Sequence, residues 1–120
     1  MLVVMRFAVP EGDGDDPDAG AEFAERARVA LGVLAARTGY RGGQLGRAYD
    51  DPAYWVLVTE WESVGAYRRA LSHYDVKVSA TPLLAQALLE PSAYEPLAVA
   101  APGGTVSVAD SDRASIPSRP

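Results

Sequence analysis

The sequence predicts an α+β domain of the ferredoxin-like class, in which helices cover one face of a four-stranded antiparallel sheet. The first observation is the order of the segments, which alternate as β-α-β-β-α-β with an additional short helix before the last strand. The second is a central strand that is apolar on both faces. The third is the length of 120 residues, which suits one domain with a buried core.

The first strand and the first helix differ in their hydrophobic periodicity. Leu2–Val9 is rich in Val, Met and Phe, which favour extended backbone. Glu11–Asp18 is a polar turn whose last carboxylates can cap the helix that follows. Within residues 19–37, apolar side chains recur at intervals of three and four, which predicts a helix that Gly39 ends.

Two strands form the centre of the predicted sheet. Tyr40–Tyr49 is rich in glycine and should therefore be bulged or closely approached by another group. Asp50–Pro52 is a turn. Tyr54–Trp61 has no polar residue before Thr59, which indicates burial on both faces.

The second helical region begins at Ser63, a good N-cap residue. Tyr67 and Leu71 would share one face of this helix. His73–Ala80 fits either a short helix or an irregular link. Thr81–Leu88 is predicted to be a further short helix, because it opens with an N-cap threonine and a proline at the first helical position.

The chain is predicted to end in an edge strand and a tail. Tyr94–Ala100 is the last strand, and Pro96 confines it to an edge or to irregular pairing. The following residues are mostly Pro, Gly, Ser, Asp and Ala, which bury too little surface to offset the entropy of ordering them. We therefore expect a domain over residues 1–100 and a disordered or loosely attached tail over residues 101–120.

Composition argues against several kinds of site and partner. The chain has no cysteine and a single histidine, so no metal site of the usual zinc or iron type is expected. Its net charge is −5 and it has no basic stripe, so neither nucleic acid nor a membrane surface is an expected partner. The apolar start carries Arg6 and follows no basic segment, so it is predicted to be a strand, and the protein to be cytoplasmic.

The central strand predicts a homodimer. Side chains alternate between the two faces of a strand. One face carries Trp55, Leu57, Thr59 and Trp61, and the other carries Val56, Val58 and Glu60. Because both sets are largely apolar, the helices would cover one face and a second copy of the chain the other.

A family resemblance lies in Tyr54–Leu71, YWVLVTEWESVGAYRRAL. It resembles the signature of the antibiotic biosynthesis monooxygenase superfamily, dimeric α/β barrels in which a strand ends in Trp-x-Ser and a helix with an aromatic residue follows. Here these are Trp61, Ser63 and Tyr67. The element order is similar over about residues 1–100. The resemblance implies a pocket between sheet and helices, lined by Trp61, and activities that include cofactor-free oxygenation of aromatic polyketides, quinol oxygenation and haem degradation.

The chain departs from that family pattern at two places. Polyketide oxygenases of the family share a pocket asparagine, whereas this chain has no asparagine and carries Leu57 in that neighbourhood. Haem-degrading members place an axial histidine at about Ala70 or Leu71, and His73 lies beyond that point. The position of His73 argues against haem degradation, and no metal or organic cofactor is expected.

A small apolar or aromatic ligand is the expected partner, and the aromatic residues are its candidate contacts. Trp61 and Tyr67 could form a wall for a flat ligand, although plain core packing explains such residues equally well. Further substrate-binding candidates are Thr59, Leu57 and Tyr74. Weaker candidates for hydrogen bonds to the ligand are Tyr40, Tyr49 and Arg47.

The candidate catalytic residues are His73 and Arg6. His73 is the side chain whose ordinary pKa lies nearest neutrality, so it could act as the general base. It could equally be a solvated surface residue or a helix cap. Arg6 lies in the middle of an apolar strand and needs a partner, for which Glu60 or Glu95 is favoured over an anionic ligand.

Three functions remain open at the level of sequence. The first is a cofactor-independent monooxygenase acting on an aromatic or polyketide-like molecule. The second is a ligand-binding or stress-related dimer without turnover. The third is a cyclase-type enzyme, which needs acid–base groups but no oxygen.

Overall fold

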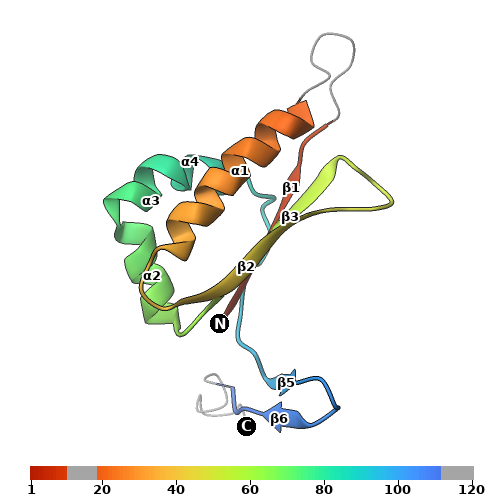
Figure 1. Cartoon of the computed structure of the whole chain (residues 1–120), viewed down its shortest axis with the longest axis vertical. Coiled ribbons are helices and arrows are strands. Elements are labelled where there is room, and N and C mark those ends of the chain that lie inside the picture. Colours follow the sequence, from red (N-terminus) through yellow and green to blue (C-terminus); the bar gives the residue numbers. More distant parts are fainter. Residues whose placement is uncertain (11–18, 112–120) are drawn as a thin grey trace, which may run out of the picture.

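A computed structural model describes residues 1–10 and 19–111, and an antiparallel sheet with helices on one face is its main feature (Figure 1). The acidic segment Glu11–Asp18 and the last residues of the tail, 112–120, lie outside the described residues. The elements are β1 (Leu2–Ala8), α1 (Ala19–Ala35), β2 (Tyr40–Arg47), β3 (Tyr54–Trp61), α2 (Val64–Ser72), α3 (Tyr74–Ser79), α4 (Thr81–Leu84), β4 (Ala93–Tyr94), β5 (Ala98–Ala100) and β6 (Val106–Val108).

The main sheet has four strands in the order β2-β3-β1-β4, and the fold predicted from the sequence is confirmed. Strand β3 pairs with both β1 and β2 in antiparallel register. The expected irregularity of β2 is confirmed as well, since the register shifts between Tyr40 and Gly42. A Cβ atom at Gly43 would lie 2.6 Å from the Tyr40 hydroxyl oxygen and 2.8 Å from the Val58 carbonyl oxygen, so only glycine fits there.

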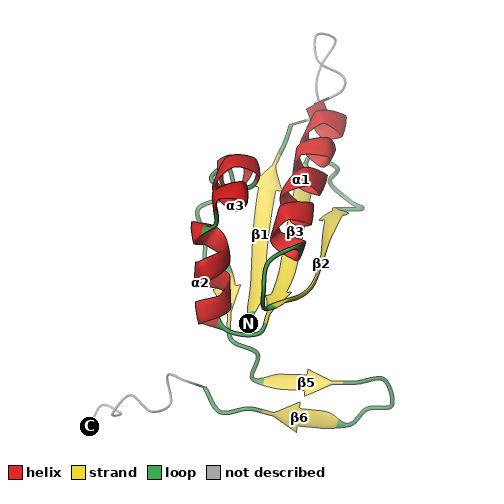
Figure 2. Cartoon of the chain, turned by 60° about the vertical axis from the view of Figure 1, so that its left-hand side comes forward, coloured by secondary structure: helices red, strands yellow, loops and turns green. Residues whose placement is uncertain are grey.

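The helices cover one face of the sheet (Figure 2). Both tryptophans of β3 are buried on that face. Phe23 of α1 lies between two aromatic rings of the sheet, with its centroid 5.1 Å from that of Phe7 and 5.4 Å from that of Trp55. The predicted cap of α2 is confirmed, because the Ser63 hydroxyl accepts a hydrogen bond of 3.0 Å from the Ala66 N–H. None of the helices in the described ranges combines the length and apolar character needed to span a membrane.

In the part of the chain that the structure describes, no helix lies over the other face of the sheet. Its centre is formed by half-buried apolar side chains of β1 and β3, namely Leu2, Val4, Val56 and Val58. We call this surface the open face. Polar and larger residues surround it, among them Arg6, Tyr54 and Glu60, which are exposed.

The helices α3 and α4 differ from the prediction. A helix forms before Thr81, where the prediction was ambiguous, and the helix that begins at Thr81 is shorter than predicted. The ambiguous residues before Thr81 form the short helix α3. The helix expected over Thr81–Leu88 stops at Leu84, so its predicted end was wrong. The chain instead runs along β1, where the Leu88 N–H donates a hydrogen bond of 2.8 Å to the Arg6 carbonyl oxygen.

The prediction of a single last strand over Tyr94–Ala100 was also wrong. Only β4 joins the main sheet, opposite Leu2 and Val3. Strand β5 leaves the sheet and pairs with β6 in a separate hairpin, which stands apart from the rest of the chain in both views (Figures 1 and 2). Strand β6 thus lies inside the segment expected to be disordered or loosely attached, and the positive φ angles of Gly103 and Gly104 allow the turn before it.

Candidate functional site

An apolar hollow of about 580 Å³ lies beside β1, between that strand and helices α2, α3 and α4. Its apolar lining consists of Met5, Leu71, Leu84, Ala85 and the ring of Tyr67. Lys77 and Thr81 also line it and supply its other polar groups. We call it the apolar hollow. An apolar wall with a few polar groups is typical of small-molecule sites.

Tyr67 connects the apolar hollow to the aromatic core. Its ring centroid lies 5.3 Å from that of Trp61, and Trp61 in turn meets Tyr40 edge to face at 5.4 Å. Burial raises the pKa of the Tyr67 hydroxyl above its ordinary value, so this group stays protonated at neutral pH. Within the described part of the chain that hydroxyl has no hydrogen-bond partner, and it is therefore able to donate to a ligand.

Trp61 is a core residue behind Tyr67. Only 1% of it is exposed, and its indole Nε1–H donates a hydrogen bond of 2.8 Å to the Thr59 hydroxyl, which is itself buried. Trp61, Thr59 and Leu57 all face the helices, as the alternation of β3 predicts, and none of the three lines the apolar hollow. They could influence a ligand in the apolar hollow only indirectly, by holding the Tyr67 ring in position.

His73 lies away from the apolar hollow, at the junction between α2 and α3. Its Nδ1 accepts a hydrogen bond of 3.1 Å from the Asp75 N–H, so the ring caps the start of α3. It lines a different hollow, together with Arg37 and Arg69. Tyr74, the neighbouring candidate, is 74% exposed. The structure therefore does not bring these two candidates together with Tyr67.

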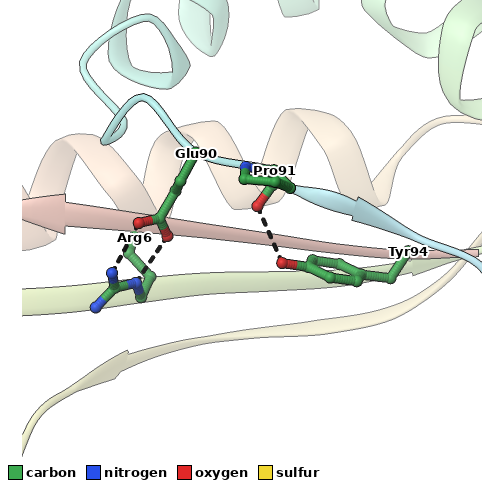
Figure 3. A network of polar contacts seen from close by, with 4 residues as sticks. All are labelled: Arg6, Glu90, Pro91 and Tyr94. Atoms are coloured by element: carbon green, nitrogen blue, oxygen red, sulfur yellow. Dashed lines mark hydrogen bonds and ion pairs between the residues drawn. The ribbon is translucent and has the colours of Figure 1, made fainter.

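Arg6 projects from the open face of the sheet and is paired with Glu90 (Figure 3). Its Nε and Nη2 donate hydrogen bonds of 2.8 and 2.7 Å to the two carboxylate oxygens. Glu60 and Glu95 were the expected partners, and this expectation was wrong because the segment after α4 runs along β1 and brings Glu90 beside Arg6. The hydrogen bond and the charge of Arg6 lower the pKa of Glu90 below its ordinary value.

Sequence reasoning missed most of the lining of the apolar hollow. Met5 alternates with Arg6 on β1 and could have been assigned to the helix face by that alternation. Lys77, Thr81 and Leu84 gave no such signal, because their position depends on how α3 and α4 turn back toward β1. In residues 1–10 and 19–111 no group of three or more His, Asp or Glu side chains is arranged to hold a metal ion.

Comparison with known proteins gives a family match and a set of similar folds. The family model described as antibiotic biosynthesis monooxygenase matches residues 1–80. That range includes β1 to β3, α1 to α3 and therefore Tyr67, Leu71 and Lys77. No match was found among curated proteins.

Several solved structures share the fold. SnoaB from Streptomyces nogalater, a cofactor-independent oxygenase, is 26% identical over 80% of this chain and 94% of its own, with a TM-score of 0.60. A single-residue variant of SnoaB gives 28% identity over 72% and 82% of the two chains, with a TM-score of 0.59. The protein Rv0793 from Mycobacterium tuberculosis is 20% identical over 83% of this chain and 97% of its own, with a TM-score of 0.62.

Proposed function

The chain belongs to the antibiotic biosynthesis monooxygenase family, and on that premise we propose that it oxygenates an aromatic or polyketide-like small molecule without a cofactor. The observation that carries this proposal is the apolar hollow, which has the size and lining of a site for a flat apolar molecule. The similarity to SnoaB, a cofactor-independent oxygenase, supports the type of reaction.

The proposed reaction proceeds through a carbanion of the substrate, which the protein has to stabilise. A phenol or an activated CH₂ group loses a proton, and the resulting anion donates an electron to O₂. Oxidation of CH₂ to C=O by one O₂ releases one H₂O, so no external reductant is consumed. The protein has to hold the anion in an apolar surrounding and stabilise its oxygen.

Two groups in the lining suit that task. The protonated Tyr67 hydroxyl can donate a hydrogen bond to the developing oxyanion. Lys77, whose residue is exposed, contributes a positive charge at the rim of the apolar hollow. The proton of the substrate then passes to water at that rim. His73 and Arg6 line other hollows and take no step in this scheme.

Oxygen uptake tests the proposal directly. We expect uptake with at least one member of a panel of anthrones, quinols and phenols, and a kcat reduced about tenfold or more in Tyr67→Phe and Lys77→Gln. His73→Gln is the matched control, since it removes a candidate base outside the apolar hollow and should leave kcat unchanged. Absence of uptake with every compound would remove the oxygenase proposal.

A ligand-binding protein without turnover is the second candidate. The observation in its favour is that His73, the side chain best suited to act as a base near neutral pH, does not line the apolar hollow. Saturable binding of a panel compound that Tyr67→Phe weakens, without oxygen uptake, would support it. Product formation under anaerobic conditions would instead indicate a cyclase-type enzyme.

We also propose that the protein forms a homodimer through the open face. None of the described helices covers its half-buried apolar centre at Val4, Val56 and Val58, and a second copy would cover it in a symmetric interface. Sedimentation should give about twice the chain mass of 12.7 kDa. The cytoplasmic location remains a prediction from the sequence, which cell fractionation tests.

A further inference from the structure

A second hollow of about 300 Å³ lies on the other side of α2 from the apolar hollow. Arg37 and Thr38, from the connection between α1 and β2, form one wall, and Arg69, Ala70 and His73 form the other. We call it the basic hollow. An α-helix turns by roughly 100° per residue, so Arg69 and His73 point away from the side that carries Tyr67 and Leu71. The two hollows therefore use opposite sides of one helix.

We propose that the basic hollow binds a small tetrahedral oxyanion, a phosphate ion or the phosphate group of a monoester. Two guanidinium groups and one imidazole line it, and no carboxylate does. Among the described residues neither Arg37 nor Arg69 forms an ion pair. Arginine side chains recognise phosphate by paired hydrogen bonds from their planar nitrogens.

Arg37 supplies an independent observation. Its Nε–H is shut off from solvent and has no acceptor among the described residues. Buried donors are nearly always satisfied, and a donor on a charged group is especially costly to leave without an acceptor. Because this atom is closed to solvent, an oxyanion in the hollow that Arg37 lines would accept a hydrogen bond from the Nε–H only after the side chain rotated toward the hollow.

His73 is held in the tautomer that such a site needs. Its Nδ1 accepts a hydrogen bond from the Asp75 N–H, so in the neutral ring the proton is on Nε2. The ring lines the basic hollow with Nε2–H as its remaining donor. The Asp75 carboxylate, 3.9 Å from Nδ1, lies on the opposite, capping side of the ring.

Helix ends offer a simpler explanation for the charges, but only for part of them. Arg37 follows the carboxyl end of α1 and Arg69 lies in the last turn of α2, where positive charge offsets the helix dipole. A cation in that role would donate its hydrogen bonds to the terminal carbonyl oxygens. The Arg37 Nε–H does not do so, and the dipole gives no reason for a shared hollow.

Calorimetric titration of the full chain with inorganic phosphate, at constant ionic strength in NaCl, tests the proposal. We expect saturable binding with a Kd on the order of 1 mM. Arg69→Gln should weaken it about tenfold or more, because the exposed Arg69 is one of two guanidinium ligands. Arg68→Gln is the matched control, since it removes the same charge from the neighbouring position, which does not line the hollow.

Three outcomes would overturn the proposal: no saturable binding, equal weakening by Arg68→Gln and Arg69→Gln, or acetate binding as tightly as phosphate. A phenyl phosphate that binds more tightly than inorganic phosphate would identify a monoester as the ligand, and equal binding would identify the free ion. Amide chemical shifts give a second measurement. Phosphate should move the signals of Thr38 and His73, and leave that of Leu71 in place.

Discussion

The two faces of β3 have similar side chains and opposite surroundings. On one face Trp55, Leu57, Thr59 and Trp61 are all buried beneath the helices, whereas on the other Val56 and Val58 are only half-buried and Tyr54 is 39% exposed. Hydrophobicity alone does not distinguish the faces, because both are largely apolar. The difference teaches that an apolar strand predicts that both of its faces need to be covered, while the described helices cover one face only.

The buried face should be the more sensitive one, and Trp61→Ala tests this most severely. We expect a loss of about 3–5 kcal/mol in the free energy of unfolding, because the substitution leaves a cavity among aromatic rings. It should also weaken ligand binding in the apolar hollow, since Tyr67 loses the ring that supports it. Urea unfolding measures the first effect. Tyr54→Ala on the open face is the control, and an equal loss there would remove the contrast between the faces.

Substitutions on the open face should weaken dimer formation and have little effect on the folding of the monomer. We expect Val58→Asp to dissociate the proposed dimer while the monomer keeps its helical circular dichroism, because the charge lies where a second copy would pack. Sedimentation velocity measures the mass. Val29→Asp, at an exposed position of α1, is the matched control and should remain a dimer. A Val58→Asp protein that stays dimeric would show that another surface forms the interface.

A smaller effect is expected from Thr59→Val on the buried face. The substitution keeps the shape of the side chain but leaves the Trp61 indole N–H without its acceptor, which should cost about 1–3 kcal/mol in the free energy of unfolding. Thr81→Val serves as the comparison, since its hydroxyl donates a longer hydrogen bond of 3.3 Å at an exposed residue. Equal losses would mean that burial of Thr59 does not matter.

The smallest effect on stability is expected from Arg6→Gln on the open face. Arg6 lowers the pKa of Glu90 from its ordinary 4.5, so their pairing stabilises the fold above that pH and ceases to do so as the pH falls through the lowered value. The variant should therefore unfold more easily than the parent at pH 7 and equally easily well below pH 4.5. NMR titration should show the Glu90 carboxyl returning toward its ordinary pKa. Arg28→Gln, which breaks a more exposed pair with Glu25, is the control and should destabilise the fold less at pH 7.

Prediction from the sequence succeeded where the signal was local. The alternation of Trp55 to Trp61, the cap at Ser63 and the irregular glycine-rich β2 each depend on a few neighbouring residues, and each is present in the structure. The order of elements follows from the same signals. These features define the sheet, the helix-covered face and the position of Tyr67.

Features that depend on the path of the chain were not predictable in this way. The partner of Arg6 is 84 positions away, and its identity depends on how the residues after α4 return along β1. The same return brings Leu84 and Ala85 to the apolar hollow. His73 was a candidate because of its chemistry. It shares one side of α2 with Arg69 through helical spacing, whereas its proximity to Arg37 depends on how the α1–β2 connection lies against α2.

The short strand β4 has a consequence for how this protein can diversify. Past Val3, an irregular segment lies along the edge of β1. Its backbone hydrogen bonds to β1 run from the Val4 N–H to the Ser92 carbonyl oxygen and from the Leu88 N–H to the Arg6 carbonyl oxygen, and Glu90 adds the ion pair with Arg6. No strand register constrains the length of that segment, so insertions and deletions there need not shift the sheet. Because its first residue, Ala85, lines the apolar hollow, evolution can change which molecule is accepted by altering one loop while the framework is inherited intact.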